Sequence, residues 1–441
     1  MENPAPPPRA YSRLLSNRSF ARVFFAGLGS IAGSSIASVC LVWIVFADTG
    51  SPLDVGLLGT SWLVAGILFS VFGGTLVDRY DRRRLMIGAD VARALAMGIV
   101  VVVLDLHGFD LLTVLGSYFV IGAFTTIFSP AEQAIIPALV EAPLVADANG
   151  LVRSSRSALQ FVGVAIGGVL IVSLGPVWGV AANAATFALS AMLLLGMSVR
   201  PVPALAGRLK PSYLADVREG FRWLWRARGF LQLTLSATFF NFCSGLVGAF
   251  IVVFVTVLLH GSALVFALLL ALEVAGTGIG SLLVSRLRAV RWAGRAWTIG
   301  YGSAAGAVAV VLALFPSVPT AAVCLFAIGA LQGFAGTAWL TAAQLLVPPE
   351  MQGRYFGIDA LGSIAIIPAA QIGGALLIQG YGVQATYLWT AVFWVAAGLL
   401  FLIPRALATL GFPPREVPGV TLRSDGAAAG TNGSLGESRA S

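Results

Sequence analysis

Charge is scarce in this chain of 441 residues: Asp, Glu, Lys and Arg make up 10% of it, whereas about 25% is usual in soluble proteins. Hydrophobic residues make up 58%. This balance excludes a water-soluble globular protein. Cysteine is scarce too, and Cys40, Cys243 and Cys324 each lie inside an apolar stretch. That placement supports neither a disulfide framework nor a zinc cluster.

Chemical motifs are also missing. The sequence has no Gly-x-x-x-x-Gly-Lys phosphate loop and no catalytic triad, so we expect neither an enzyme nor an ATP-hydrolysing protein. We expect no cofactor and no metal ion. The N-terminus has arginines but no short apolar region with a small-residue cleavage site, so we expect the first membrane helix to direct insertion.

Long uncharged stretches, by contrast, are abundant, and crossing a bilayer takes about 20 apolar residues. Divided at charges and at Gly/Pro pairs, these stretches predict twelve spans: 19–47, 55–77, 85–105, 111–138, 145–174, 177–199, 229–259, 262–285, 296–315, 320–347, 355–379 and 383–404. Backbone in hydrocarbon must satisfy its own hydrogen bonds, and a barrel strand needs only about 9 to 11 residues. The spans are therefore predicted to be helices in a lipid bilayer.

The placement of basic residues tests this count. The chain has 27 Lys+Arg against 19 Asp+Glu, an excess that could indicate nucleic-acid binding. However, every basic residue except Arg93 lies in the tails, in the loops after spans 2, 4, 6, 8 and 10, or at adjoining helix ends. The opposite loops hold no Lys or Arg and carry instead Asp48, Asp54, Asp105, Asp110 and the two histidines, His107 and His260. The positive-inside rule then predicts a multi-pass protein of the cell membrane with both termini in the cytoplasm and no nucleic-acid partner.

The sequence also contains a weak internal repeat. Ile166-Gly167-Gly168-Val169-Leu170 recurs as Ile372-Gly373-Gly374-Ala375-Leu376, and Gly50-Ser51-Pro52-Leu53 has a counterpart in Gly261-Ser262-Ala263-Leu264. Both pairs relate span n to span n+6, which predicts two parallel six-helix halves. The expected organisation is a tail at 1–18, a first half at 19–199, a central cytoplasmic loop at 200–228, a second half at 229–405 and a disordered tail at 406–441.

A motif between spans 2 and 3 resembles a known signature. Gly73-Gly74-Thr75-Leu76-Val77-Asp78-Arg79-Tyr80-Asp81-Arg82-Arg83-Arg84 is similar to the major facilitator loop Gly-x-x-x-Asp-Arg-x-Gly-Arg-Arg. Asp81 stands where that signature has its second glycine, which resembles the branch containing the bacterial enterobactin exporter. Ser129-Pro130-Ala131-Glu132-Gln133 and Gln352-Gly353-Arg354 resemble the same branch. The resemblance covers about residues 15 to 405.

The resemblance implies an all-α membrane protein of twelve helices that works by alternating access. The implied function is a proton-coupled exporter of a small organic molecule such as a siderophore, a drug or a metabolite, acting as a monomer. Two alternatives stay open: an importer or facilitator of a small solute, and a membrane sensor or assembly protein that kept the fold without transport.

The signature loop further implies a conformational latch on the cytoplasmic side. The repeat geometry of the family puts Asp78 near the start of span 11, and a helix N-terminus carries about half a positive charge. The latch residues are Gly74, Asp78, Arg79, Arg82, Arg83 and, on the other half, Asp359. Exposed ion pairs contribute about 0 to 1 kcal/mol each, so several together bias an equilibrium without freezing it.

Ionisable residues within spans are costly and usually face a bundle interior or an aqueous cavity. Glu273 lies near the middle of span 8 and is the first candidate for a proton site; alternatively, it packs two helices as a neutral acid. Glu132 in span 4 is a candidate for gating or proton coupling. Asp90 and Arg93 stand three residues apart and are expected to form a structural pair.

Two polar residues are candidates for a substrate cavity. Asn241 lies in span 7 and Gln332 in span 10, on helices that line the cavity in proteins of this kind. Either residue could instead bridge neighbouring helices.

Overall fold

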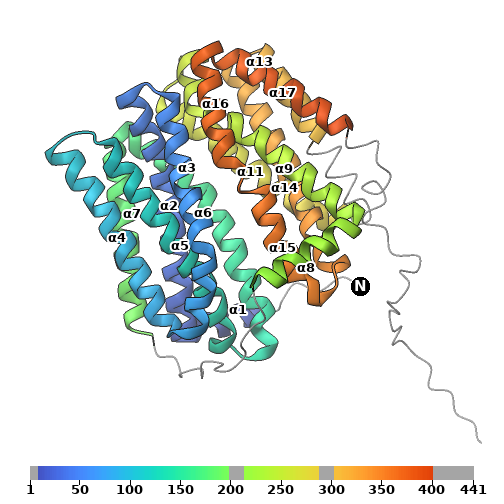
Figure 1. Cartoon of the computed structure of the whole chain (residues 1–441). Helices are drawn as coiled ribbons and strands as arrows, with labels where there is room; N and C mark the ends of the chain where they lie inside the picture. Colours follow the sequence, from blue (N-terminus) through green and yellow to red (C-terminus); the bar gives the residue numbers. More distant parts are fainter. Residues whose placement is uncertain (1–7, 198–212, 288–301, 401–441) are drawn as a thin grey trace, which may run out of the picture.

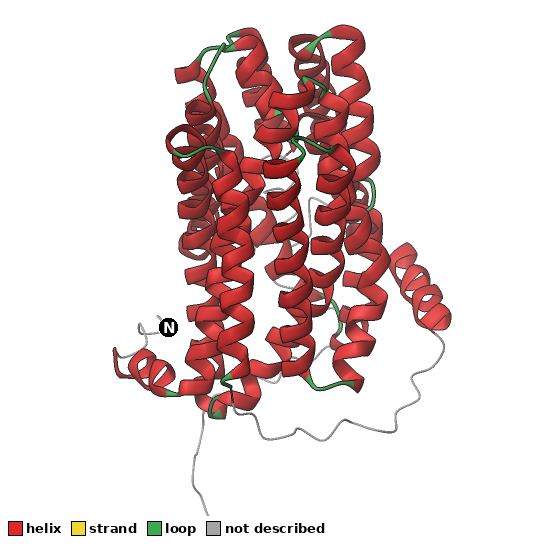
Figure 2. Ribbon diagram, turned by 90° about the vertical axis from the view of Figure 1, so that its left-hand side faces the viewer, coloured by secondary structure: helices red, strands yellow, loops and turns green. Residues whose placement is uncertain are grey.

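The structure, a computed structural model, describes residues 8–197, 213–287 and 302–400. Within these ranges several side chains, including those of residues 71–75, 78 and 79, are not described. Every regular element of the described part is a helix (Figure 2), which confirms the predicted all-α fold.

The first half begins with a short helix and continues with six long ones. They are α1 (Pro8–Ser16), α2 (Arg18–Thr49), α3 (Pro52–Arg79), α4 (Arg82–Leu106), α5 (Leu111–Leu139), α6 (Val145–Ser173) and α7 (Pro176–Leu195). A single 3-10 turn, Ala142–Leu144, leads into α6.

The second half also begins with a short helix, but it is less regular. Its elements are α8 (Tyr213–Arg226), α9 (Arg228–Gly248), α10 (Ile251–Val253) with a π-helical turn at Phe254–Leu258, α11 (Ala263–Leu287), α13 (Ala305–Leu314), α14 (Val318–Leu346), α15 (Pro349–Ser363), α16 (Ile367–Tyr381) and α17 (Val383–Leu400).

Nine helical stretches of the described part are long and apolar enough to cross a membrane, and two shorter apolar helices, Gly302–Leu314 and Val383–Leu399, lie at predicted spans 9 and 12. The prediction of one continuous helix over 355–379 is wrong, because the chain turns at residues 364–366 between α15 and α16. Pro368 explains the break, since proline lacks an amide hydrogen and its ring clashes with the carbonyl four residues earlier.

Local sequence signals set several helix ends. Gly50 ends α2 with a φ of 62°, a left-handed conformation that glycine adopts without strain. Asp110 begins α5, because its carboxylate accepts hydrogen bonds from the hydroxyl and the backbone amide of Thr113. Both bonds stabilise the charged carboxylate, the hydroxyl bond more than the amide bond. They hold the pKa of the exposed Asp110 carboxyl below its usual value.

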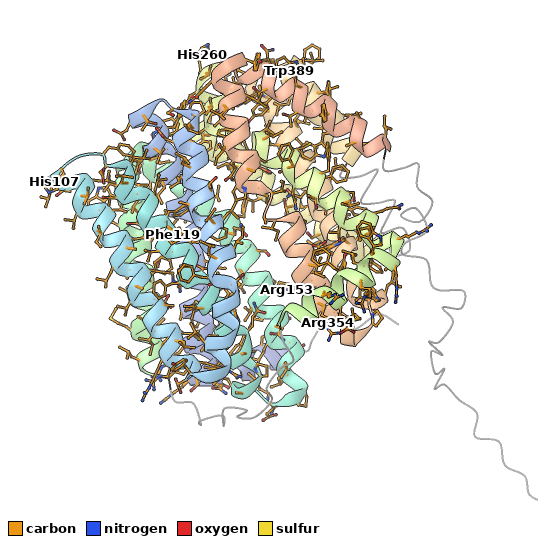
Figure 3. The ribbon with its side chains drawn as sticks, in the orientation of Figure 1. His107, Phe119, Arg153, His260, Arg354 and Trp389 are labelled. Carbon is orange, nitrogen blue, oxygen red and sulfur yellow. The ribbon has the colours of Figure 1, made fainter. Side chains whose placement is uncertain are left out.

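The two ends of the bundle differ in charge. His107 and His260 lie at one end and Arg153 and Arg354 toward the other (Figure 3). We call the end with the histidines the acidic end, because it also carries the loops with Asp48, Asp54, Asp105 and Asp110. We call the other end the arginine-rich end.

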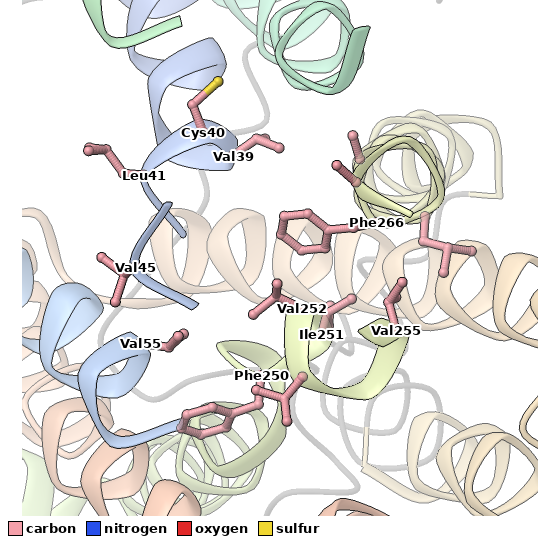
Figure 4. Close-up of a cluster of buried hydrophobic side chains, with 14 of the residues drawn as sticks. Val39, Cys40, Leu41, Val45, Val55, Phe250, Ile251, Val252, Val255 and Phe266 are labelled. Carbon is pink, nitrogen blue, oxygen red and sulfur yellow. The ribbon is translucent and has the colours of Figure 1, made fainter. Parts of the chain in front are cut away.

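The first half, α2–α7, and the second half, α9–α17, lie side by side (Figure 1). Extensive contacts between described residues of the two halves involve two helix pairs, α3 with α16 and α6 with α11, and α2 makes a smaller contact with α10. One hydrophobic cluster crosses between the halves, bringing Val39 and Val45 together with Val252 and Phe266 (Figure 4). Each of the other buried clusters belongs to a single half. The halves are therefore joined toward the acidic end.

Candidate functional site

The break between α15 and α16 is held by a row of polar side chains on α9. Thr234, Thr238 and Asn241 follow one another at helical spacing and so share one face. The Asn241 amide donates to the carbonyl oxygen of Ser363 at 2.7 Å, and the Thr238 hydroxyl donates to that of Gly362 at 3.0 Å. These carbonyls stand next to the break, so α9 satisfies part of the backbone that a continuous helix would have satisfied. In this state Asn241 bridges α9 and α15, which is one of the two roles that the sequence allowed for it.

Asp359 is buried one turn before the break. Its carboxylate accepts hydrogen bonds from the Thr234 hydroxyl at 2.9 Å and the Ser363 hydroxyl at 3.2 Å. All three residues belong to the second half.

The arginines of the signature loop engage the first half. Arg82 donates to the carbonyl oxygen of Ala134 at 2.8 Å, and Arg83 donates to that of Leu194 at 2.9 Å. Arg82 and Asp359 thus have separate partners in this state. The side chains of Asp78 and Arg79, and residue Gly74, lie outside the part whose side chains are described, so the latch stays a prediction.

Four ionisable side chains form one buried network in the first half. Asp90 and Arg93 of α4 form a salt bridge, as predicted from their spacing, and the Ser190 hydroxyl of α7 donates to Asp90 at 2.5 Å. Glu132 of α5 pairs with Arg156 of α6, and Glu132 also interacts electrostatically with Asp90 and Arg93. Two acids and two bases leave the network without net charge.

Aromatic rings complete this network. The Arg93 guanidinium lies 4.3 Å from the ring centre of Phe128 and 4.5 Å from that of Phe187, within the range of cation–π attraction. Glycine at position 27 makes room for Glu132, because a Cβ there would lie 2.3 Å from the carboxylate. Sequence reasoning missed Arg156 as the partner of Glu132, although the predicted span 145–174 already contained it.

Glu273 lies mid-way along α11 and is half-buried. Tyr387 of α17 is close enough to interact with it electrostatically, and the Tyr387 hydroxyl donates to the carbonyl oxygen of Val247 at 2.8 Å. Among the described residues no basic side chain pairs with Glu273. Gln332, on the neighbouring helix α14, is exposed.

The backbone around Glu273 is fixed by close packing of α11 on α14. A Cβ at Gly329 would lie 2.0 Å from the Glu273 carbonyl oxygen, and a Cβ at Gly280 would lie 1.9 Å from that of Ala330. Gly276 and Gly333 meet the opposite backbone at similar distances. Small residues at such spacing let membrane helices approach closely.

The contact between halves, which we call the seam, consists of Trp43, Gly56, Gly59, Thr60 and Gly168 against Phe266, Ala267 and Gln371. The Thr60 hydroxyl donates to the Gln371 side-chain oxygen at 3.2 Å. A Cβ at Gly168 would lie 2.0 Å from that of Ala267. The seam contains no ionisable residue. The sequence analysis did not single out Gln371, whose only signal was a polar residue inside a span.

Comparisons with known proteins agree with this architecture. The chain is 25% identical over 413 residues to the multidrug efflux pump Tap of Mycobacterium tuberculosis H37Rv, covering 91% of this chain and 97% of Tap. It is 27% identical over 220 residues to the macrolide efflux protein A of Streptococcus pyogenes, covering 48% of this chain and 53% of that protein.

Solved structures share the fold. The nucleoside transporter NupG superposes with a TM-score of 0.70 at 10% identity, covering 87% of this chain and 98% of NupG. A bacterial homologue of the human lysosomal transporter Spinster, solved in an inward-facing conformation, superposes with a TM-score of 0.68 at 16% identity, covering 90% of this chain and 98% of that one.

A family profile decides the assignment, because the profile described as Major Facilitator Superfamily matches residues 23–366. Its members are secondary transporters, so the expectation that the chain is not an enzyme is confirmed. With this match, the two joined halves and the shared fold, the chain belongs to the major facilitator superfamily.

Proposed function

We propose that this transporter exports small, largely apolar organic molecules from the cytoplasm in exchange for protons, as a monomer. The multidrug and macrolide efflux pumps among its relatives support export, and they also support organic molecules of low polarity as substrates. Siderophores stay among the candidate substrates because of the resemblance to the enterobactin exporter branch.

Both termini and the arginine-rich end lie in the cytoplasm in this proposal. The charge difference between the ends of the bundle supports this orientation. The structure then represents a state closed to the outside and open to the cytoplasm.

The single observation that carries the proposal is that, among the described residues, the two halves meet mainly in a seam toward one end. Alternating access requires such a contact to form at one end and break at the other as the halves rock. Helices packed along their whole length on both sides would instead suit a rigid sensor or assembly protein.

The latch operates in the opposite state. When the arginine-rich end closes, Asp78 and Arg79 approach the part of α15 at which predicted span 11 begins, near Tyr355. Arg82 and Arg83 then exchange their present partners for contacts with the second half, including Asp359. Asp78→Asn is expected to lower transport severalfold at normal protein levels, whereas Asp81→Asn, which removes a neighbouring charge but keeps an oxygen that can cap α4 at Arg84, leaves most transport intact. Equal transport by both variants would count against the latch.

Proton coupling uses Glu273, with Glu132 as a second site. A proton moving inward releases about 2.3 kcal/mol per 100 mV and about 1.4 kcal/mol per pH unit, which can drive accumulation of a solute.

Flux measurements in proteoliposomes test the function. The purified protein is reconstituted, its orientation is determined, and a pH gradient is imposed with a macrolide, a lipophilic cationic dye or a siderophore present. We expect uphill movement toward the compartment that faces the acidic end, dependent on the gradient. Movement in the other direction would indicate an importer, and binding without flux would indicate a sensor.

A further inference from the structure

Each half begins with a short helix directly before its first long helix. Only Asn17 separates α1 from α2, and only Ala227 separates α8 from α9. The short helix α1 packs against α6, and α8 packs against α15. Because the repeat relates span 5 to span 11, these two contacts are equivalent. We call α1 and α8 the lead-in helices.

The lead-in helices also match at three apolar positions, at an offset of 210. Leu14 and Leu224 are their buried anchors, 1% and 3% exposed. Tyr11 and Leu15 on α1 are 36% and 39% exposed, and Phe221 and Trp225 at the equivalent positions of α8 are 50% and 73% exposed. Both helices thus bury one leucine and present a pair of large apolar side chains, one turn apart, away from the protein.

Arginines share the exposed face of α8. Arg218, Arg222 and Arg226 follow at intervals of four residues, on the side that carries Phe221 and Trp225. All three are exposed, and among the described residues none is paired with a carboxylate.

The remaining sides of α8 contact the protein, beginning next to the arginines at Glu219. Glu219 forms a salt bridge with Arg354 at 3.1 Å, and a Cβ at Gly220 would lie 2.6 Å from Ile358. The helix therefore has one side fixed on α15. Its other face is both cationic and aromatic and has no partner among the described residues.

The position of α8 identifies what can cover this face. Since α9 is a membrane span and starts after a single intervening residue, α8 lies at the bilayer surface (Figure 1). Aromatic side chains are enriched at that depth, and basic side chains attract anionic headgroups there. We propose that α8 is an interfacial helix that binds anionic phospholipid, with Phe221 and Trp225 inserted at the acyl boundary and Arg218, Arg222 and Arg226 bound to headgroup phosphates.

The other lead-in helix serves as an internal comparison. Arg13 of α1 is paired with Glu141 at 3.7 Å, so its charge is engaged by the protein. Anionic lipid therefore acts at α8 more than at α1.

Lipid binding by the full-length protein tests the charge component. Binding of phosphatidylglycerol is measured by native mass spectrometry and in nanodiscs with and without that lipid. Each arginine near an anionic surface contributes about a fivefold gain in affinity, so Arg222→Gln/Arg226→Gln is expected to weaken binding by about 25-fold. The matched control is Arg84→Gln/Arg153→Gln, which removes two exposed arginines elsewhere at the same end. Equal loss in both variants, no loss in either, or competition by free glycerophosphate would overturn the proposal.

A nitroxide label tests the insertion component independently. A cysteine at position 225 is labelled in the full chain, where the three native cysteines are buried. We expect the label to collide with oxygen and to be shielded from a water-soluble nickel chelate, whereas a label at Arg153 meets the chelate. Equal access of the chelate to both positions would show that α8 does not lie in the interface.

Discussion

Arg93 is buried in the first half, where an uncompensated charge costs several kcal/mol. Asp90 on its own helix and two aromatic faces from neighbouring helices surround its guanidinium. Glu132 and Arg156 provide a second pair that is coupled to the first. Helices α4, α5 and α6 are thus tied together by charges, each of which is compensated only while its partner is present, and α7 adds the Ser190 hydroxyl and the Phe187 ring.

This mutual dependence predicts a specific pattern of mutant stability. Arg156→Met leaves the Glu132 carboxylate buried without its partner and is expected to lower the free energy of unfolding by about 3 to 5 kcal/mol. Glu132→Gln/Arg156→Met removes both charges and should recover most of that loss. Unfolding in a denaturing detergent measures both variants. Losses that simply add would show that the two side chains act separately.

Glu273 differs because it has no basic partner among the described residues. Glu273→Gln keeps its shape and hydrogen bonding but removes titration. We expect this variant to bind substrate and to lose proton-driven accumulation and its pH dependence. Flux and binding measured on the same preparation separate the two effects, with the exposed Glu219→Gln as a control. A variant that still concentrates substrate with unchanged pH dependence would assign Glu273 a packing role and direct attention to Glu132.

Among the elements, α11 and α14 form the closest helix pair, and glycines at complementary positions set their distance. Glu273 and Gln332 are carried by these two helices, so the packing that joins them also fixes both candidate residues relative to each other.

Gly280 and Gly278 of α11 offer a matched test of this packing. Gly280→Ala forces the helices apart and is expected to destabilise the protein by about 1 to 3 kcal/mol. A Cβ at Gly278 meets nothing within 4 Å, so Gly278→Ala should be neutral or stabilising by up to about 1 kcal/mol. Detergent unfolding of the two variants gives the comparison, and equal stabilities would mean that α11 and α14 separate without cost.

At this scale the sequence predicts much of the fold, because hydropathy and charge placement are local signals. The ends of α2, α4 and α5 fall within three residues of the predicted spans 19–47, 85–105 and 111–138. The break in the eleventh span was not predicted, although Pro368 signals it, because the apolar residues on both sides of that proline read as one continuous span. Contacts such as Glu132 with Arg156, or Thr60 with Gln371, depend on how the helices are arranged in space, which hydropathy does not report.

For the whole molecule, the seam determines which end is closed. Gly168 and Ala267 meet there without room for a further carbon atom. A larger side chain at position 168 therefore opposes this state and leaves the interior of each half unchanged.

We expect Gly168→Leu to shift the population toward a state open at the acidic end. Spin labels at His107 and Ser262, which are exposed on different halves, report the separation as a distance distribution. Gly150→Leu on the same helix α6, where a Cβ meets nothing within 4 Å, is the control. Unchanged distances in Gly168→Leu would show that the seam tolerates the added volume and does not set the equilibrium.

The apolar nature of the seam also determines how the conformational equilibrium responds to temperature. Opening it hydrates apolar side chains, and exposure of apolar surface to water raises the heat capacity. Hydrophobic stabilisation also weakens on cooling. The balance between the two states should therefore follow a curved van 't Hoff plot, with cold favouring the state in which the seam is open. Added salt should have little influence on the seam itself, because none of its residues is ionisable.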